Sequence, residues 1–570
     1  MRMSSKPSHS IKSEINPGDL AARGKAFFYK GQKRQAQMTF AEAVILAPDN
    51  AEYKAMLVQS LSGRQIFPQY DENIKRAIIL CLEEDNIFHL PLFFSWHSLL
   101  LLDPATKILS DLQDCPDYET FLDILESHDI SDTLNDNFLH QGLNKLLMKD
   151  YNFERLLTHL RRYALLEASP DQLQEMAPFL AALSAQCFFN EYIFYVTKEE
   201  QERINTISSS PNVPDPVNII ILSCYQPLYG MDKTEDLAHI LKQSRISSAE
   251  GLIQIQITEP IEEAQIKKNI ESFGSIADNT SKAVQEQYEE NPFPRWSSCG
   301  GQREDNKKKL SAGKKVLVAG CGTGQQAVIT SMNFPEADII AIDLSKASLA
   351  YAQRKTKEYG LTNLTFMHGD ILEVGDIGIE FDHIACGGVL HHMKSPKDGF
   401  QALKNILKKD GVMRIGVYSE SARKNIVAVQ NWIINQKIPS TLKGIRNFRK
   451  EFVEGGYKEI FGDTLPYFDN FSVSETRDLF FHVQEHRFTC LGLKELLNDM
   501  EMDLLIFAPE AYAVHQRFPQ LFPDDPKALN LENWHIIEQK NPGLFIGMYK
   551  FYICHEGQHE PGTTPKWLEM

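Results

Sequence analysis

Two patterns of apolar and polar residues divide the chain. Between about residue 70 and residue 270, apolar side chains recur every three or four positions, as over 73–82, 154–166 and 173–189. That period predicts consecutive amphipathic helices, with one short strand at 219–222. From residue 314 onward, short uncharged apolar runs such as 316–319 and 339–342 alternate with longer helical segments. Such runs are typical of buried strands in a parallel sheet. The sequence therefore predicts an all-α N-terminal half and an α/β C-terminal half.

A glycine-rich turn follows the first predicted strand. Gly320, Gly322 and Gly324 come directly after it at two-residue spacing. Glycine tolerates the dihedral angles of a tight turn, and its missing Cβ lets a ligand lie against the backbone. Asp343 ends the next predicted strand, where a carboxylate can reach a ribose diol. The pattern predicts a site for a nucleoside-bearing cofactor.

The spacing of the glycines narrows the choice of cofactor. The dinucleotide fingerprint is G-x-G-x-x-G, whereas the third glycine here comes one residue early. A phosphate-binding P-loop is excluded, because neither Lys-Ser nor Lys-Thr follows the turn.

Residues 283–555 resemble the class I S-adenosylmethionine-dependent methyltransferases. The glycine loop, Asp343, the pair Gly369-Asp370, the segment 381–392 and the turn 407–411 match that family's features in order. The resemblance implies a Rossmann-like seven-stranded sheet, with 545–554 as its antiparallel last strand, and S-adenosyl-L-methionine as the cofactor. It implies a cofactor site made of Gly320, Cys321, Gly322, Thr323, Gly324, Asp343, Leu344, Gly369, Asp370, Ile371 and Gly387. One departure is Val318, where many members carry an acid.

Candidate catalytic residues follow the fourth and fifth predicted strands. His391 and His392 stand at the carboxyl edge of the sheet, where an acceptor approaches. A histidine there can act as a base near neutral pH, or it can hold the loop by hydrogen bonds. Tyr418 begins the segment 418–502, which in this family often forms a lid over the substrate.

Two further segments carry candidate substrate residues. Tyr288, Arg295 and Trp296 belong to a segment where related enzymes carry a cofactor-capping helix; such side chains exclude water and bind a carboxylate. In the lid, the candidates are His482, His486 and Arg487. His482, Glu485 and His486 also spell H-x-x-E-H, a zinc-protease pattern that requires a helix. Thr489 reads as the N-cap of a helix that starts after these histidines, so we expect no metal site.

The N-terminal half contains a tetratricopeptide-like pattern. Its residues fall on the 34-residue repeat: Gly24, Phe27, Ala36, Phe40, Ala43 and Pro48. Small residues let two helices approach closely, and the aromatic rings fill the seam. The helical half either recognises a protein or peptide partner or shields the enzyme domain, and the sequence leaves both open.

The motifs and composition shifts set the expected domain organisation. We expect a disordered tail over 1–16, repeat-like helices over 17–84 and a helical domain over 85–270. These are followed by a linker with the capping helix over 271–313 and by the methyltransferase domain over 314–555. We expect a loose tail over 556–570.

Composition restricts location and partners. The formal net charge of −17 makes nucleic acid an unfavourable partner. The nine cysteines form no C-x-x-C pair, which argues against a disulfide framework. The most apolar run, 87–102, is too short and too mixed to span a bilayer. We also find no secretory signal, so we expect a cytoplasmic protein.

Three functions are compatible with these features. The first is methyl transfer to a protein or peptide that the helical half presents. The second is an O- or C-methyltransferase for a small molecule. The third is a scaffold that keeps the cofactor fold without turnover.

Overall fold

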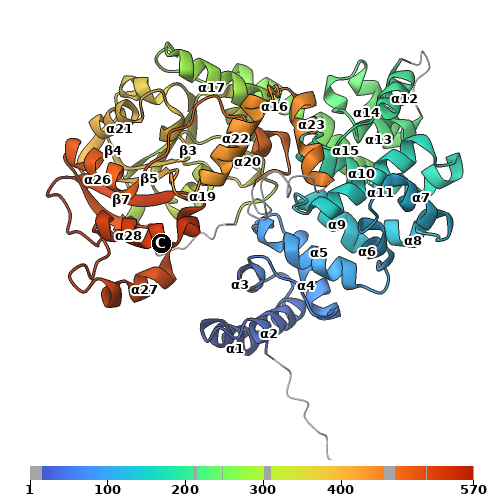
Figure 1. Cartoon of the computed structure of the whole chain (residues 1–570), viewed down its shortest axis with the longest axis horizontal. Helices are drawn as coiled ribbons and strands as arrows, with labels where there is room; N and C mark the ends of the chain where they lie inside the picture. The colour runs from blue at the N-terminus through green and yellow to red at the C-terminus, as the bar shows by residue number, and fades with distance from the viewer. Residues whose placement is uncertain are drawn as a thin grey trace, which may run out of the picture. The chain divides into compact units, whose positions relative to one another are not determined.

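The computed structural model, drawn in Figure 1, describes residues 16–209, 215–244, 246, 248–300, 310–454, 469–508 and 510–568. Within these ranges, only the backbone of Phe452, Val453 and Tyr512 is described. The predicted tail over 1–16 lies outside them except for Asn16, which is the N-cap of the first helix. The chain divides into two compact units, Met1–Leu146 and Leu147–Met570. This division after Leu146 differs from the boundaries after residues 84 and 270 that we expected.

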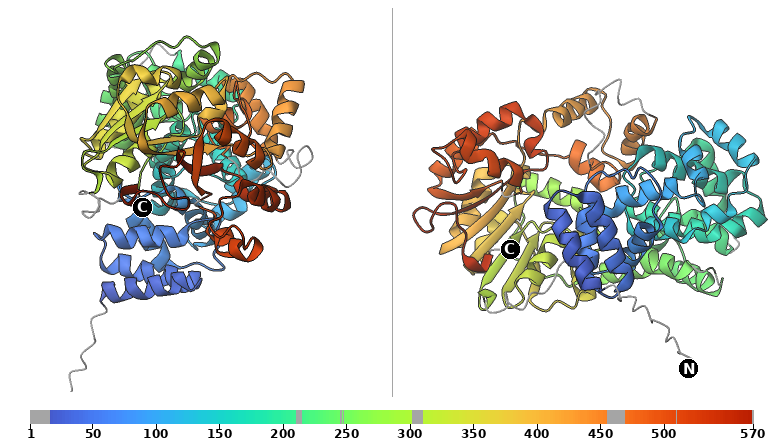
Figure 2. Two further views of the ribbon diagram at one scale, coloured as in Figure 1. Left: turned by 90° about the vertical axis from the view of Figure 1, so that its left-hand side faces the viewer. Right: turned by 90° about the horizontal axis from the view of Figure 1, so that it is seen from below.

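The first unit begins with the helix pair that the repeat pattern predicts. Helices α1 (Pro17–Tyr29) and α2 (Lys33–Leu46) lie side by side in both views of Figure 2. Gly24 lies so close to Phe40 that a Cβ atom there would stand 2.5 Å from the ring. The small residue therefore allows the close approach, while the tetratricopeptide assignment itself stays a prediction.

The remaining helices of this unit explain why no boundary follows residue 84. Lys75 in α4 (Glu72–Leu82) forms ion pairs with Asp103 at 2.5 Å and with Asp136 at 3.5 Å. Trp96 donates a hydrogen bond to the carbonyl of Phe138 at 2.8 Å. The ion pairs of Lys75 therefore join residues on both sides of the predicted boundary. The other elements of this unit are α3 (Ala51–Leu61), η1 (Leu90–Leu92), α5 (Phe93–Leu102), α6 (Ile108–Gln113), α7 (Tyr118–Glu126), α8 (Ser131–Leu134) and α9 (Asn137–Lys145).

The second unit opens with a helical segment. The predicted strand at 219–222 is wrong, because these residues belong to α13 (Pro216–Ser223), whose start is fixed by Pro216 and the capping side chain of Asp215. The other elements are α10 (Tyr151–Leu166), α11 (Pro170–Phe189), α12 (Lys198–Ser208), η2 (Leu228–Gly230), α14 (Thr234–Gln243), α15 (Ala249–Ile253), η3 (Gln254–Thr258) and α16 (Glu259–Lys268).

A seven-stranded sheet follows, as predicted. Its order is β3-β2-β1-β4-β5-β7-β6, and β7 runs antiparallel to both β5 and β6 while the other pairs are parallel. The strands, visible in Figure 1, are β1 (Lys315–Ala319), β2 (Asp338–Asp343), β3 (Leu364–His368), β4 (Phe381–Gly387), β5 (Leu407–Val417), β6 (Met502–Phe507) and β7 (Tyr549–His555). The strand order reverses between β1 and β4, which is where α/β sheets of this kind bind ligands.

Both faces of the sheet are buried. Alternate residues of β1 point to opposite faces: Leu317 packs in one apolar cluster with Ile384 and Trp534, and Val318 packs in another with Leu349. The covering elements are α19 (Gln325–Asn333), α20 (Lys346–Glu358), η4 (Ile371–Ile377), η5 (Leu390–His392), α21 (Pro396–Asn405), α26 (Cys490–Asp499), α27 (Tyr512–Leu521), α28 (Leu531–Lys540) and η7 (Pro542–Phe545). Helix α17 (Asn279–Glu290) precedes the sheet in the chain.

The described residues of the predicted lid form three further helices. They are α22 (Lys424–Asn435), α23 (Leu442–Val453) and α25 (Val473–Phe480), while residues 455–468 lie outside the described part. The helical segment holds this lid. Arg449 of α23 forms a buried ion pair with Glu154 of α10, and Glu191 accepts a hydrogen bond from the backbone N–H of Ser474 at 2.5 Å.

The C-terminal residues are not the loose tail that we expected. Trp567, in η8 (Lys566–Leu568), packs edge-on against Phe334 with ring centroids 5.4 Å apart, and Leu568 is buried. Elsewhere, none of the helices in the described ranges has both the length and the apolar character needed to cross a bilayer.

Candidate cofactor and acceptor site

A cavity of about 520 Å³ lies at the carboxyl ends of β1, β2 and β4. Its volume is typical of small-ligand sites. Nine of the eleven predicted cofactor residues line it: Gly320, Cys321, Gly322, Asp343, Leu344, Gly369, Asp370, Ile371 and Gly387. The other two support the loop from behind. The carbonyl of Thr323 accepts a hydrogen bond from the indole of Trp296 at 3.0 Å, and Gly324 lies against Ala352.

The glycine loop is held tightly by its neighbours. Gly320 and Gly322 have φ angles of +69° and +52°. A Cβ on Gly320 would lie 2.3 Å from Val389, and one on Gly322 would lie 2.5 Å from the carbonyl oxygen of Phe293. Glycine is therefore required at both positions by the conformation and by the packing.

Two aspartates present carboxylates to the cavity. The oxygens of Asp343 accept hydrogen bonds from the backbone N–H groups of Gly322 and Ser345, both at 2.8 Å. Burial raises the pKa of Asp343 to about 6, although these two hydrogen bonds oppose the shift. Asp370 caps η4 by accepting from the N–H of Leu372 at 3.0 Å. Both carboxylates are fixed in place and can accept further hydrogen bonds from a ligand.

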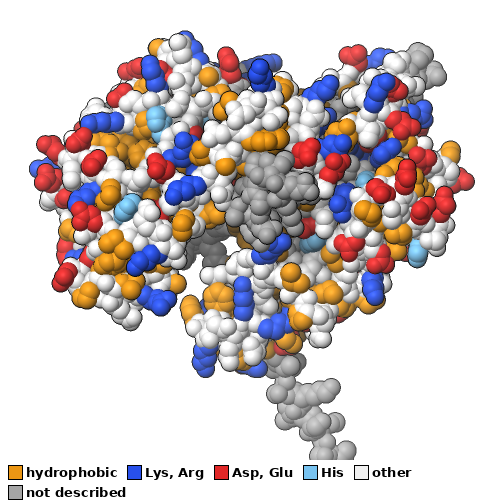
Figure 3. Space-filling view, viewed as in Figure 1, with side chains coloured by type: hydrophobic (Ala, Val, Ile, Leu, Met, Phe, Trp, Pro, Cys, Tyr) orange, Lys and Arg blue, Asp and Glu red, His pale blue; other side chains and the backbone are white. Residues whose placement is uncertain are grey.

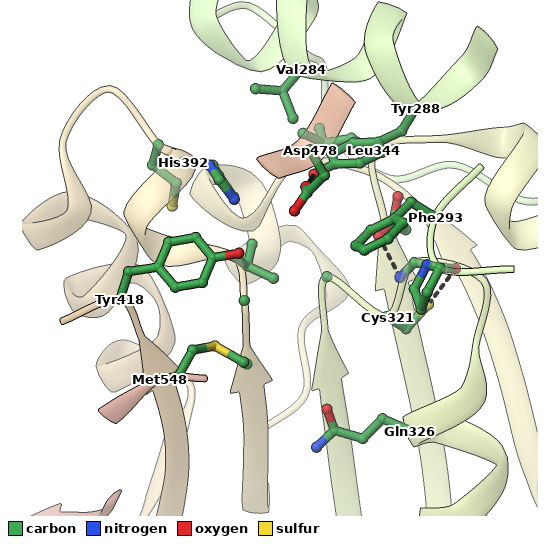
Figure 4. Close-up of a pocket in the computed structure, with 18 of the residues that line it drawn as sticks. Val284, Tyr288, Phe293, Cys321, Gln326, Leu344, His392, Tyr418, Asp478 and Met548 are labelled. Atoms are coloured by element: carbon green, nitrogen blue, oxygen red, sulfur yellow. Dashed lines mark hydrogen bonds between the residues drawn. The ribbon is translucent and has the colours of Figure 1, made fainter. Parts of the chain in front are cut away.

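The other end of the cavity is built around His392. Its Nδ1 lies 2.8 Å from the carbonyl oxygen of Gln484, so this nitrogen carries the proton of the neutral ring. Nε2 then has a lone pair available in the cavity. Burial lowers the pKa of His392, while nearby Asp478 acts in the opposite direction. Figure 4 shows the His392 ring and the Asp478 carboxylate pointing into one space.

Asp478 reaches this space from α25. The hydroxyl of Tyr288 donates to its Oδ1 at 2.6 Å, and Nε2 of His482 lies 3.3 Å from the same hydroxyl. The ring of His482 stacks on that of His392 with centroids 3.6 Å apart. Burial raises the pKa of Asp478.

His392, Asp478 and His482 offer possible metal-ligand atoms within 4.8 Å of one another. The hydrogen bonds nevertheless favour a metal-free arrangement. The backbone N–H of Gln484 donates to Nδ1 of His482 at 3.1 Å, so the proton of this neutral ring belongs on Nε2. A protonated Nε2 has no lone pair for a cation. His482 therefore suits a hydrogen bond to Tyr288 better than a metal.

Tyr418 lies between two other side chains. Its ring centroid is 3.8 Å from that of His391 and 3.7 Å from the guanidinium carbon of Arg423. Arg423 is in turn held by Glu485 through hydrogen bonds of 3.0 and 2.6 Å. This stack fixes the tyrosine with its hydroxyl toward the cavity (Figure 4).

Comparison with known proteins agrees with this geometry. A family model described as "Methyltransferase domain" matches residues 310–456. Residues 310–456 are therefore a methyltransferase domain, and the seven-stranded sheet to which they contribute has the Rossmann-like order expected of class I enzymes. The methyl donor of this class is S-adenosyl-L-methionine.

Individual relatives match only parts of the chain. An uncharacterized protein from Synechococcus is 32% identical over 177 residues, which are 28% of this chain and 42% of the relative. A ubiquinone biosynthesis O-methyltransferase from Chromobacterium violaceum is 32% identical over 122 residues, which are 21% and 50%. The structure of PKMT2 from Rickettsia typhi in complex with AdoHcy gives a TM-score of 0.35 at 15% identity, covering 47% of this chain and 55% of that one. The chain thus spans about half or less of these two curated relatives.

Several predicted site residues of the methyltransferase domain lie outside the cavity lining. Arg295 pairs with Glu191 at 3.4 Å, and Arg487 pairs with Glu485 at 3.1 Å. Trp296 packs against Tyr351 and Tyr359 behind the glycine loop. His391 and His486 also belong to this group, and their backbones are joined by a hydrogen bond of 2.6 Å. Burial holds the pKa of His391 well below its ordinary range.

Sequence reasoning did not select several lining residues: Phe293, Gln326, Arg423, Asp478 and Met548. Phe293 and Arg423 belong to the segments that the sequence analysis describes as a cofactor cap and a substrate lid. Their position in these segments could therefore have indicated a place in the site. Asp478 follows Glu475 by three residues on α25, which places both on one helix face. No motif marks that helix.

Proposed function

We propose that the chain transfers the methyl group of S-adenosylmethionine to an acceptor bound beside His392. The observation that carries this proposal is a single cavity lined by the glycine loop, Asp343 and Asp370 at one end and by His392, Tyr418 and Asp478 at the other. When bound, the donor supplies a methyl group on a sulfonium, which is already an activated electrophile.

The protein's part in this chemistry is to bind, orient and remove a proton. Asp343 holds a ribose, and Asp370 reaches the adenine as the family pattern implies. Nε2 of His392 accepts a proton from the acceptor, because its other nitrogen is committed to Gln484. Tyr288 and Phe293 cover the site and exclude water.

The acceptor that we propose is a protein or peptide. Residues 16–146 form a compact unit of their own and supply none of the described lining residues, so they remain available for recognising a partner. The segment 147–268 has a different role, because it holds the lid through Glu154 and Glu191. Partner recognition is therefore assigned to the first unit alone.

The surface charge and the cysteines support a protein acceptor, rather than nucleic acid, in the cytoplasm. Acidic and basic side chains are interspersed over the face in Figure 3, and the net charge is −17, which is unfavourable for a nucleic-acid acceptor. The nine cysteines are buried thiols, in agreement with a reducing cytoplasm.

A small-molecule acceptor is the second candidate. The similarity to proteins named as ubiquinone biosynthesis O-methyltransferases favours it.

Labelled methyl transfer in cell extract separates the candidates. The full chain and a chain starting at Leu147 are compared, with S-adenosylhomocysteine binding as the control for folding. Protein labelling by the full chain alone supports a protein acceptor. Labelling of small molecules by both chains supports the second candidate. If both bind the cofactor and neither labels anything, the protein is a scaffold.

A further inference from the structure

Asp478 differs from Asp469 and Glu475, the other two carboxylates of the lid that line the cavity. Its side chain is only 7% exposed, and its hydrogen-bond partner is the neutral hydroxyl of Tyr288. Among the described side chains, no lysine or arginine lies within ion-pair distance of it. By contrast, Lys149 pairs with Asp469 at 3.0 Å and with Glu475 at 3.4 Å. Asp478 is thus a buried carboxylate without a cation in direct contact, although His392 and Arg423 act on it at longer range. Such burial is costly unless a ligand supplies a contacting cation.

The surroundings of Asp478 also suit a cation. Rings of Tyr288, Tyr418 and His392 line the same end of the cavity, and Figure 4 shows them grouped about the carboxylate. The Tyr418 ring is already packed between His391 and Arg423, so its contribution is the hydroxyl oxygen, which can accept a hydrogen bond from an ammonium ion. The one guanidinium in the described lining belongs to Arg423, and two hydrogen bonds to Glu485 commit it elsewhere.

We propose that the acceptor is an amine, which enters as an ammonium ion and binds between Asp478 and the hydroxyl oxygen of Tyr418. This inference rests on the proposed function and names the acceptor atom. An anionic acceptor is disfavoured because Asp478 repels it. A neutral alcohol leaves the buried carboxylate without a counter-ion.

The neighbouring histidine completes the chemistry. An ammonium nitrogen has no lone pair, so it must lose a proton before it can accept a methyl group. Nε2 of His392 takes that proton, and its possible ligand atom lies within 4.8 Å of that of Asp478. The nitrogen lone pair then forms the new N–C bond while the C–S bond breaks and its electron pair stays on sulfur. The product is a methylated ammonium ion and a thioether.

Binding of a small probe tests the subsite without requiring the natural acceptor. Butylammonium and 1-butanol are titrated into the full-length protein saturated with S-adenosylhomocysteine, and binding is followed by ligand-observed NMR. We expect the wild-type protein to bind butylammonium about tenfold or more tightly than butanol. Asp478→Asn should remove this preference and leave S-adenosylhomocysteine binding unchanged. Asp499→Asn, an exposed change of the same kind, should retain it.

Equal binding of the two probes to the wild-type protein would overturn the proposal, and so would an unchanged preference in Asp478→Asn. Absence of saturable butylammonium binding would overturn it too. If Asp478→Asn fails to fold, the wild-type comparison still decides. If S-adenosylhomocysteine itself does not bind, the proposed function fails, and the same titration of the protein alone still shows whether the subsite takes an ammonium.

Discussion

Arg449 and Glu154 form a bidentate ion pair between the lid and the helical segment. The two hydrogen bonds measure 2.6 and 2.8 Å, and the side chains are only 1% and 2% exposed. Since 295 residues separate them in the sequence, this pair joins two distant segments of the same unit. It also helps to place α25, because Arg449 donates to the carbonyl of Asn470, just before that helix.

Breaking this pair should destabilise the protein strongly. In Glu154→Gln the buried guanidinium loses its counter-charge, which typically costs about 3–5 kcal/mol. Chemical denaturation measures the change in unfolding free energy. Glu262→Gln, which breaks an exposed pair with Lys357, serves as the control and should change it by about 0.5 kcal/mol or less. Equal effects of the two substitutions would show that the buried pair does not hold the lid.

His392 and His391 should respond differently to substitution. His392→Asn removes the proposed base, so we expect turnover to fall by about 10²–10⁴-fold while cofactor affinity stays the same. His391→Gln changes a ring that does not line the cavity, and its effect should be smaller than about tenfold. Because burial lowers the pKa of His392, the rate should fall on the acid side at a pH below the ordinary 6.5. A wild-type pH profile in His392→Asn would contradict the assignment.

Metal removal should leave activity unchanged. His482 carries a proton on Nε2, so this nitrogen cannot bind a metal ion. The possible metal site therefore keeps only two ligands, His392 and Asp478. We therefore expect purified protein to contain much less than one metal ion per chain, and dialysis against EDTA to have no effect on turnover. Stoichiometric zinc, together with loss and recovery of activity on its removal and return, would contradict this expectation.

Cofactor affinity should depend on pH through Asp343. Its pKa is raised from 3.8 to about 6, so the free protein binds a proton there below that pH. A ligand that needs the carboxylate must displace this proton, and its affinity should fall as the pH drops below about 6. The same shift makes the folded state relatively less stable as the pH rises from about 4 to about 6. Calorimetric titrations at several pH values check the affinity, and Asp343→Asn should remove the dependence.

The cofactor end of the site follows from local sequence, whereas the acceptor end does not. Gly320, Gly322 and Asp343 stand beside strands that the apolar runs reveal, and parallel strands bring their carboxyl ends together. The N-cap at Thr489 was also predictable, and it correctly places His482 before α26 rather than on a helix. Asp478 reaches the cavity because α25 packs against the helical segment. This contact joins residues that are distant in the sequence, so no local sequence pattern predicts it.

The domain boundaries show the same limit. Changes in sequence character placed a boundary after residue 84, but the ion pair between Lys75 and Asp103 crosses that point. A helix boundary can be found from caps and periodicity. Which helix covers each apolar face depends on packing between segments that are distant in the sequence. The division after Leu146 depends on the same packing, so local patterns do not reveal it.

Calorimetric binding of S-adenosylhomocysteine to the wild-type protein and to Asp343→Ala tests the central claim most directly. We predict that the wild-type protein binds one equivalent. The substitution should weaken binding by about 1.5–3 kcal/mol, or more than tenfold, because hydrogen bonds to the ribose are lost from a charged acceptor. No binding to the wild-type protein, or equal affinity in the two proteins, would contradict the assignment of this cavity as the cofactor site.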